Sequence, residues 1–242
     1  CLVGSEMCIR DRTVEDMGKA AQNNLLASVA LLKTYSDEAF AHVESEEELV
    51  DRYEDRLGTY LMRITERELT REENESVSKY LHTLSDFERI SDHAMNIAEA
   101  AREINQKKLR FTGAAEHELG VLSAAVQEIL DVASRAFFAN DVELAYRVEP
   151  LEERIDVLCD ELKLHHVERL QSGECSLENG FVFNDLLANF ERVADHSSNL
   201  AIATIELCSD RYDTHEYVIN LKELHSHRFD EYYEEYAQKY SV

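Results

Sequence analysis

The stretch D-F-E-R-I-S-D-H-A-M-N-I-A-E, residues 86–99, decides the fold of this chain, because nearly the same letters return 103 positions later. Residues 189–202 read N-F-E-R-V-A-D-H-S-S-N-L-A-I. The identical positions are mostly polar, so a shared core composition does not explain them: Phe87, Glu88, Arg89, Asp92, His93, Asn96, Ala98 and Ala100 match Phe190, Glu191, Arg192, Asp195, His196, Asn199, Ala201 and Ala203. A repeat of this kind indicates a duplicated domain.

Both copies have the apolar period of a helix, in which each residue advances about 100° around the axis. The apolar seam of the first copy is formed by Phe87, Ile90, Ala94, Ile97, Ala101 and Ile104. Roughly the opposite side carries the acidic and amide positions of both copies, Glu88, Asp92 and Asn96, then Glu191, Asp195 and Asn199. These acidic side chains are therefore predicted to lie outside the core, at matching places in two repeats.

The composition predicts an all-α protein. The chain has 242 residues, of which 44% are hydrophobic, enough to fill a core. One proline and seven glycines leave few positions that would break a helix. A formal net charge of −25 excludes nucleic acid and anionic membrane surfaces as partners, because both need clustered lysine and arginine. This charge favours cations and basic protein surfaces instead.

The cysteines indicate neither a disulfide framework nor a zinc site. Their number is odd, and no C-x-x-C pair occurs among Cys1, Cys8, Cys159, Cys175 and Cys208. This usage fits a reducing cytosol, so a cytoplasmic protein is expected. No run of about 18 apolar residues is present, so this segment is not expected to insert directly into a membrane.

Capping residues divide each repeat into three helices. In the first repeat, the first expected helix runs from Val14 to about Tyr35. The second begins at a cap formed by Ser36 or Asp37 and is about 30 residues long. The third begins at a capping box, residues 70–73, and ends at about Asn105. A basic loop, residues 106–113, separates the repeats. In the second repeat, the first expected helix covers residues 114–139. The second runs from a cap at Asn140–Asp141 to Gly173, with a kink or joint at Pro150. The third begins at Ser176.

The expected architecture is therefore a tandem pair of three-helix bundles, residues 13–112 and 113–209. Residues 210–242 form a C-terminal extension, in which a helix from Leu221 to Tyr240 is expected to pack on the bundles. Residues 1–12 show no helical period and resemble a translated adaptor, so we expect a non-native segment there.

Acidic residues recur every fourth position on the helix that precedes each duplicated stretch. These ladders are Glu47, Asp51 and Asp55 in the first repeat and Glu152, Asp156 and Asp160 in the second. With Glu88, Asp92, Glu191 and Asp195 on the neighbouring helices, each repeat would gather four or five carboxylates. Such oxygen-rich clusters suit Mg, Ca or Mn, and with an occasional histidine also Fe or Zn. The alternative is a solvated acidic face that pairs with Arg89 and Arg192.

The stretch F-E-R-I-S-D-H-A-M-N-I-A and its echo resemble the signature of PhoU-like proteins. The resemblance extends from Met17 to about Ser209. It implies a tandem pair of three-helix bundles whose E/D-x-x-x-D motifs bind metal ions, divalent or ferric. The residues that match these motifs are Glu47, Asp51, Asp55, Glu88 and Asp92, then Glu152, Asp156, Asp160, Glu191 and Asp195.

The resemblance implies a regulatory role in phosphate transport, and two forms of that role are open. The first is the cytosolic domain of a sodium/phosphate cotransporter, held at the inner face of the membrane, which the additional C-terminal segment favours. The alternative is a free-standing adaptor between a phosphate ABC transporter and a sensor kinase, which represses the phosphate-starvation response. The partner is in either case a membrane phosphate transporter, in cis or in trans, and a homodimer is also possible within this family resemblance.

An enzyme is not expected. The sequence has no pairing of nucleophile and base and no glycine-rich phosphate loop. A di-iron oxidase would need Glu-x-x-His pairs directed into the bundle, whereas His93 directly follows Asp92. His93 and His196 are expected to project to the side of the acid pairs rather than to bind metal.

Overall fold

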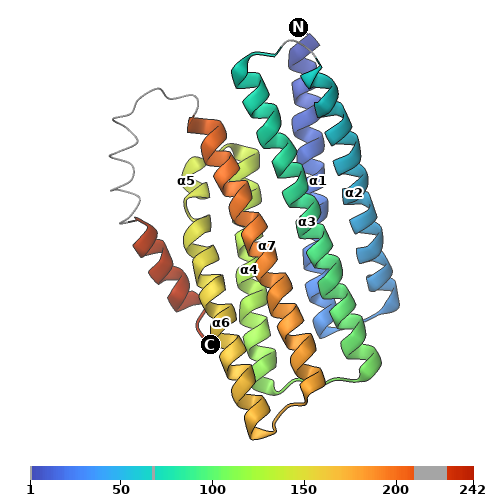
Figure 1. Ribbon diagram of the computed structural model, residues 1–242, viewed down its shortest axis with the longest axis vertical. Helices are drawn as coiled ribbons and strands as arrows, with labels where there is room; N and C mark the ends of the chain where they lie inside the picture. Colours follow the sequence, from blue (N-terminus) through green and yellow to red (C-terminus); the bar gives the residue numbers. More distant parts are fainter. Residues whose placement is uncertain (1, 67–68, 210–227) are drawn as a thin grey trace.

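The computed structural model describes residues 2–66, 69–209 and 228–242 and shows a bundle of long helices (Figure 1). The first repeat contains α1 (Leu2–Lys33), α2 (Asp37–Thr65) and α3 (Arg71–Lys107). The second contains α4 (Gly113–Ala139), the short α5 (Val142–Ala145), α6 (Val148–Ser172) and α7 (Leu177–Ser209). Residues 228–239 form a further helix. The all-α prediction is thus confirmed.

The predicted capping residues begin and end the helices. Ser36 Oγ accepts the backbone N–H of Ala39 at 3.1 Å at the start of α2. Thr70 and Glu73 exchange the two hydrogen bonds of a capping box at the start of α3. Gly173 ends α6 with φ +77°, a left-handed conformation that glycine adopts without steric cost.

The N-terminal segment differs from its prediction. Residues 2–12, in which no helical period is visible, continue α1 without a break. The buried Val14 and Met17 anchor the helix that follows this segment. Extending an existing helix orders one residue for each new backbone hydrogen bond, so residues 2–12 can be helical without an amphipathic period of their own. The foreign origin of residues 1–12 remains a prediction.

The joint expected near Pro150 lies just before it. The helix predicted from residue 142 onward is split into α5 and α6, and the break falls at Tyr146 and Arg147. Pro150 itself occupies the first turn of α6, where a backbone N–H has no partner within the helix. The proline therefore starts the longer helix instead of kinking it.

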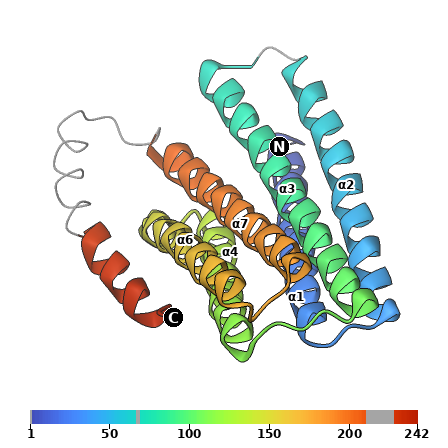
Figure 2. The ribbon, with the colours of Figure 1, turned by 60° about the horizontal axis from the view of Figure 1, so that its bottom comes forward.

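Helices α3 and α7, which carry the duplicated stretches, lie side by side at the middle of the bundle (Figure 2). Phe87 and Ile97 of α3 and Phe190 and Leu200 of α7 are completely buried. Helix α2 flanks α3, and α6 flanks α7. The predicted seams are therefore the core, and each acidic side is turned toward the flanking helix.

The C-terminal helix packs on the second repeat. Tyr236 and Tyr240 are buried, and Arg147 of the α5–α6 joint pairs with Glu235 at 3.1 Å. The carbonyl of Tyr240 accepts hydrogen bonds from Nε and Nη2 of the buried Arg154, at 3.2 and 2.8 Å. Of the predicted helix, residues 221–227 lie outside the described residues. Among the described helices, none is both long enough and apolar enough to cross a membrane.

Candidate metal centres

The first repeat brings three of its predicted ligands together. One carboxylate oxygen from each of Glu47 and Asp51 on α2 and Asp92 on α3 lies within 4.8 Å of the other two. Spacing by four residues stacks the first two side chains on one side of α2, and the packing of α2 against α3 supplies the third. Asp51 is exposed, while Glu47 and Asp92 are half-buried. A cation could therefore reach this group from solvent.

The second repeat forms the same arrangement. Glu152 and Asp156 of α6 and Asp195 of α7 each place one carboxylate oxygen within 4.8 Å of the others. These three residues are the repeat equivalents of Glu47, Asp51 and Asp92, because the duplication has an offset of 105 residues between α2 and α6 and of 103 residues between α3 and α7. The two groups are called cluster 1 (Glu47, Asp51, Asp92) and cluster 2 (Glu152, Asp156, Asp195) below.

Burial and like charges raise the pKa values of carboxyl groups in and beside cluster 1. Burial, followed by the charge of Asp51 and of Asp92, raises the pKa of Glu47. Burial and then Asp92 and Glu54 raise the pKa of Glu88 to about 7. Arg89, with Nε 3.5 Å from Glu88, opposes this shift only in part. Cluster 1 therefore holds more negative charge than its surroundings neutralise, which is the condition that a bound cation relieves.

Cluster 2 has an ammonium group beside it that cluster 1 lacks at the equivalent position. Burial and then Asp156 and Glu149 raise the pKa of Glu152 to about 7. Beside the cluster, Lys163 Nζ lies 3.1 Å from Oδ1 of Asp160 and 3.1 Å from Oε2 of Glu191. The equivalent position in the first repeat is Gly58. Two of the predicted ligands of the second repeat are therefore paired with a lysine.

The sequence of the chain matches the model of a known protein family. The model of the PhoU domain matches residues 14–101 and 119–204, which cover most of both repeats. This chain belongs to the PhoU domain family. The resemblance that the duplicated stretch indicates is thereby confirmed.

Curated relatives of the PhoU family align with part or most of the chain. The phosphate-specific transport system accessory protein PhoU homolog 1 of Thermotoga maritima is 32% identical over 116 residues, 48% of this chain and 49% of that protein. The PhoU homolog of Xylella fastidiosa is 26% identical over 190 residues, 76% of this chain and 77% of that protein. The chain thus spans about half the length of the Thermotoga relative that it matches.

Solved PhoU structures have the same fold. The crystal structure of PhoU from Pseudomonas aeruginosa superposes with a TM-score of 0.80 at 19% identity, covering 86% of this chain and 99% of that one. The phosphate transport system regulatory protein PhoU from Streptococcus pneumoniae gives a TM-score of 0.75 at 16% identity, over 86% and 97%. The tandem pair of helical repeats is therefore the PhoU fold.

Not all predicted ligands join the clusters of this PhoU domain. Asp55 and Asp160 are exposed one turn further along α2 and α6, outside the two groups of three. Glu88 and Glu191 lie beside the groups: burial and then the charge of Asp92 raise the pKa of Glu88, and Glu191 is paired with Lys163. The assignment of all ten carboxylates as ligands remains a prediction.

Sequence reasoning missed Glu54. This residue of α2 follows Asp51 by three positions, and its charge raises the pKa of Glu88 across the α2–α3 groove. A search for acids three as well as four residues apart would have found it. In the second repeat the equivalent position is Cys159, a buried thiol whose pKa is raised by burial to about 12. The two clusters are therefore similar in their ligands and different in their neighbours.

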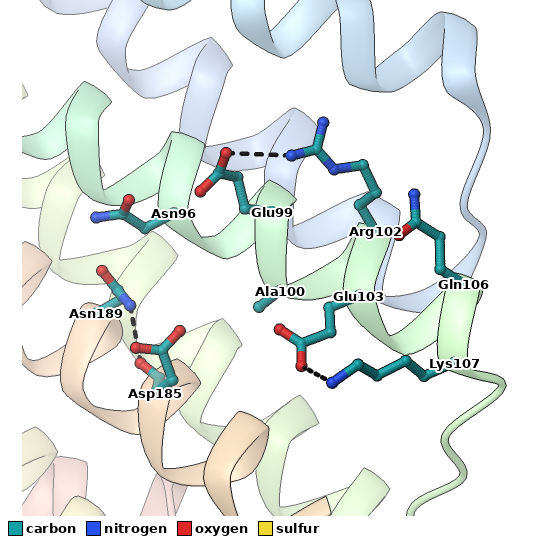
Figure 3. Close-up of a pocket in the computed structure, with 9 residues that line it drawn as sticks. All are labelled: Asn96, Glu99, Ala100, Arg102, Glu103, Gln106, Lys107, Asp185 and Asn189. Carbon is teal, nitrogen blue, oxygen red and sulfur yellow. Dashed lines mark hydrogen bonds and ion pairs between the residues drawn. The ribbon is translucent and has the colours of Figure 1, made fainter. Parts of the chain in front are cut away.

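A polar groove of about 630 Å³ between α3 and α7 does not gather a comparable ligand set (Figure 3). Its charged side chains already pair with one another: Nζ of Lys107 lies 2.8 Å from Glu103, and Nη2 of Arg102 lies 3.2 Å from Glu99. Burial, then Glu103 and Glu99, raises the pKa of Asp185 on the opposite wall. The groove is therefore close to internal charge balance, unlike the two clusters.

Proposed function

We propose that this chain is a metal-binding accessory protein that regulates phosphate transport. The observation that carries the proposal is the match of the PhoU domain to both repeats, with relatives named as accessory proteins of phosphate-specific transport systems. The proposed partner is a membrane phosphate transporter on which the protein acts in trans, coupling it to a sensor kinase and repressing the starvation response. The site of action is the cytoplasmic face of the membrane.

The clusters supply the metal-binding part of the proposal. Glu47, Asp51 and Asp92 would hold one ion, and the equivalent three residues of cluster 2 would hold another. Carboxylate oxygens suit hard divalent cations and ferric iron, so Mg, Ca, Mn, Fe and Zn are the candidates. A bound cation would offset the repulsion between neighbouring carboxylates, which after burial contributes to the raised pKa values of Glu47 and Glu152. It would also join α2 to α3 or α6 to α7.

The cotransporter domain that the sequence suggests is the second candidate. It is favoured by the helix at residues 228–239, which docks on the second repeat after the matched domain ends at residue 204. The named relatives favour the accessory protein, because each of them carries that description. Sequencing the contiguous gene distinguishes the two: upstream segments of about 20 apolar residues would support the cotransporter.

Complementation tests the accessory function. In a bacterial strain that lacks its own PhoU and expresses phosphate-starvation genes constitutively, this chain should restore repression in phosphate-rich medium, measured with an alkaline phosphatase reporter. The variant Asp51→Asn/Asp92→Asn/Asp156→Asn/Asp195→Asn should accumulate to the same level but repress less. Full expression of the wild-type chain with no repression, in a host whose own PhoU restores it, would contradict the proposed function.

A further inference from the structure

The end of the α6–α7 hairpin presents four exposed apolar side chains. The exposed fractions are 66% for Leu164, 47% for Val167, 72% for Leu177 and 75% for Phe181. These residues, called the apolar tip below, account for half of the large apolar side chains that are exposed among the described residues. Contiguous exposed apolar surface on a soluble domain is typical of an interaction site.

The two helices pack closely beneath this surface. A Cβ added to Gly180 of α7 would lie 2.6 Å from Nε2 of His166 on α6 and 3.6 Å from Leu170. Val167 and Phe181 directly follow these packed residues, so the two elements bring them to neighbouring positions. Val167 and Phe181 therefore lie side by side, and Leu164 and Leu177 lie one helical turn before them on the same two helices.

The apolar tip continues the side of the hairpin that carries cluster 2. Val167 follows Asp156 by about three helical turns, and Leu177 precedes Asp195 by about five. Each therefore projects from nearly the same side of its helix as the acid. A partner bound along the α6–α7 groove would contact both the tip and the edge of the cluster.

The first repeat does not have this surface. In the register of the duplication, the equivalents of Leu164, Val167, Leu177 and Phe181 are Thr59, Met62, Asn74 and Ser78. Three of these four are polar, although they occupy the same places on α2 and α3. The fold of a repeat therefore does not require apolar residues here, and packing within the chain does not account for them.

The border of the apolar tip is acidic. Glu168 and Glu174 are exposed beside it, whereas Asp160, one turn before Leu164, is paired with Lys163 at 3.1 Å. The first-repeat equivalent of Glu168 is Arg63. At this one border position the charge is therefore reversed between the repeats. A second copy of this chain would bring the same acidic border against itself, at a net charge of −25 for each chain.

We propose that the apolar tip binds a basic amphipathic helix of another protein. Apolar side chains at positions i, i+3, i+4 and i+7 of that helix would cover Leu164, Val167, Leu177 and Phe181. Lysine or arginine on its flanks would face Glu168 and Glu174, which fixes its orientation and speeds association. None of the four apolar residues is a proposed metal ligand, so the inference is independent of metal binding.

A designed peptide tests the proposal. The probe is a fluorescent peptide of about 18 residues, made of leucine and lysine, with the leucines at i, i+3, i+4 and i+7. Its isomer of the same composition, with the leucines spread around the helix, controls for charge alone. Binding to the full chain is measured by anisotropy at about 0.15 M salt, in EDTA and again with Mn²⁺. We expect the amphipathic peptide to bind under both conditions and more tightly than its isomer.

Two double variants, one at the apolar tip and one at exposed apolar residues of the first repeat, locate the binding. Val167→Ser/Phe181→Ser should raise the Kd of the amphipathic peptide at least about tenfold, which corresponds to about 1.4 kcal/mol. Leu26→Ser/Met62→Ser, which removes exposed residues of the first repeat, should leave it unchanged. Urea midpoints equal to that of the wild type would verify the fold of both variants.

Three outcomes would overturn the proposal. They are equal affinity for the two peptides, equal effects of the two double variants, and a wild-type dimer that Val167→Ser/Phe181→Ser converts into a monomer. The last would make the tip a contact between copies of this chain. Failure of the amphipathic peptide to bind would also overturn this proposal, but it would leave the metal and phosphate-transport proposals standing, because both are tested without it.

Discussion

The imidazole rings of His93 and His196 stack across the junction of the two repeats, with centroids 5.8 Å apart and planes at 26°. Nδ1 of His93 donates a hydrogen bond to Oδ1 of Asn189 at 2.9 Å, and Nδ1 of His196 donates one to Oδ1 of Asp86 at 3.0 Å. Asp86 and Asn189 are equivalent positions of the duplication. The histidine after each motif aspartate therefore joins the repeats, while the aspartate itself faces the flanking helix.

Removing Asp86 should loosen this junction. Asp86 accepts hydrogen bonds from His196 and from Nδ2 of Asn199, both at 3.0 Å, and its side chain is 14% exposed. Asp86→Ala leaves both donors unpaired, so we expect it to lower the free energy of unfolding in urea by about 1–3 kcal/mol. The exposed Asn96, the first-repeat equivalent of Asn199, is the matched control, and Asn96→Ala should cost less than about 0.5 kcal/mol. Equal costs would contradict this role for Asp86.

The acidity of the clusters should make the metal-free protein less stable as pH rises. Glu88 and Glu152 have pKa values of about 7 in the folded chain, above the ordinary value of 4.5. Between about pH 4.5 and 7 the folded state therefore binds more protons at these positions than the unfolded state, and its stability falls with increasing pH. His93 and His166, whose pKa values burial lowers, contribute the opposite slope below pH 6.5.

The contribution of Glu88 and Glu152 to this pH dependence is measured by comparing the wild type with a variant that lacks both carboxyl groups. Urea unfolding in EDTA between pH 5 and about pH 8 should show that Glu88→Gln/Glu152→Gln gains stability relative to the wild type as pH increases. The variant keeps the hydrogen-bonding shape of the side chains without the charge. If the difference in unfolding free energy between the variant and the wild type stays constant over this pH range, the two carboxyl groups do not titrate as proposed.

Lys163 should make the two metal sites unequal. Its ammonium group lies beside cluster 2, whereas cluster 1 has Gly58 at the equivalent position. Lys163→Met should therefore raise the Mn²⁺ affinity of cluster 2 by about three- to tenfold and leave cluster 1 unchanged. Lys19→Met, which removes an exposed lysine paired with Glu15, should change neither. Titration calorimetry resolves the two sites, and a weaker cluster 2 in Lys163→Met would contradict the prediction.

The C-terminal helix should contribute to the stability of the second repeat. Tyr236 is 1% exposed and lies beside Arg147 of the α5–α6 joint, so Tyr236→Ala should cost about 3–5 kcal/mol. Tyr233, on the half-exposed side of the same helix, is the control, and Tyr233→Ala should cost less than about 1 kcal/mol. Differential scanning calorimetry measures both. A similar, small effect of the two changes would mean that the helix is only loosely attached.

Local sequence signals predict the helices of this protein well. The cap at Ser36, the capping box at Thr70 and the left-handed Gly173 are each formed by neighbouring residues, so their spacing is visible in the sequence. The helical continuation of residues 2–12 is not visible there, because it depends on the anchored helix that follows.

Which acidic residues meet in a cluster depends on how neighbouring helices are aligned against each other. The spacing of residues along one helix does not reveal this alignment. Periodicity indicates that Glu47 and Asp51 share a side of α2, but the meeting with Asp92 depends on how α2 packs on α3. The same is true of Glu54 opposite Glu88 and of Lys163 beside Glu191. The duplication is the feature of the sequence that predicts contacts between helices, because equivalent residues of the two repeats are expected to have equivalent neighbours.

The central claim is that each repeat holds one metal ion, and metal content tests it most directly. After loading with Mn²⁺ and exhaustive dialysis, elemental analysis should find about two ions per chain in the wild type. Asp51→Asn/Asp92→Asn and Asp156→Asn/Asp195→Asn should each retain about one, and the four changes together none. Glu116→Gln/Glu234→Gln, which removes two exposed acids away from the clusters, should retain two. A wild-type chain that retains no ion, or cluster variants that retain as much as the wild type, would contradict the account.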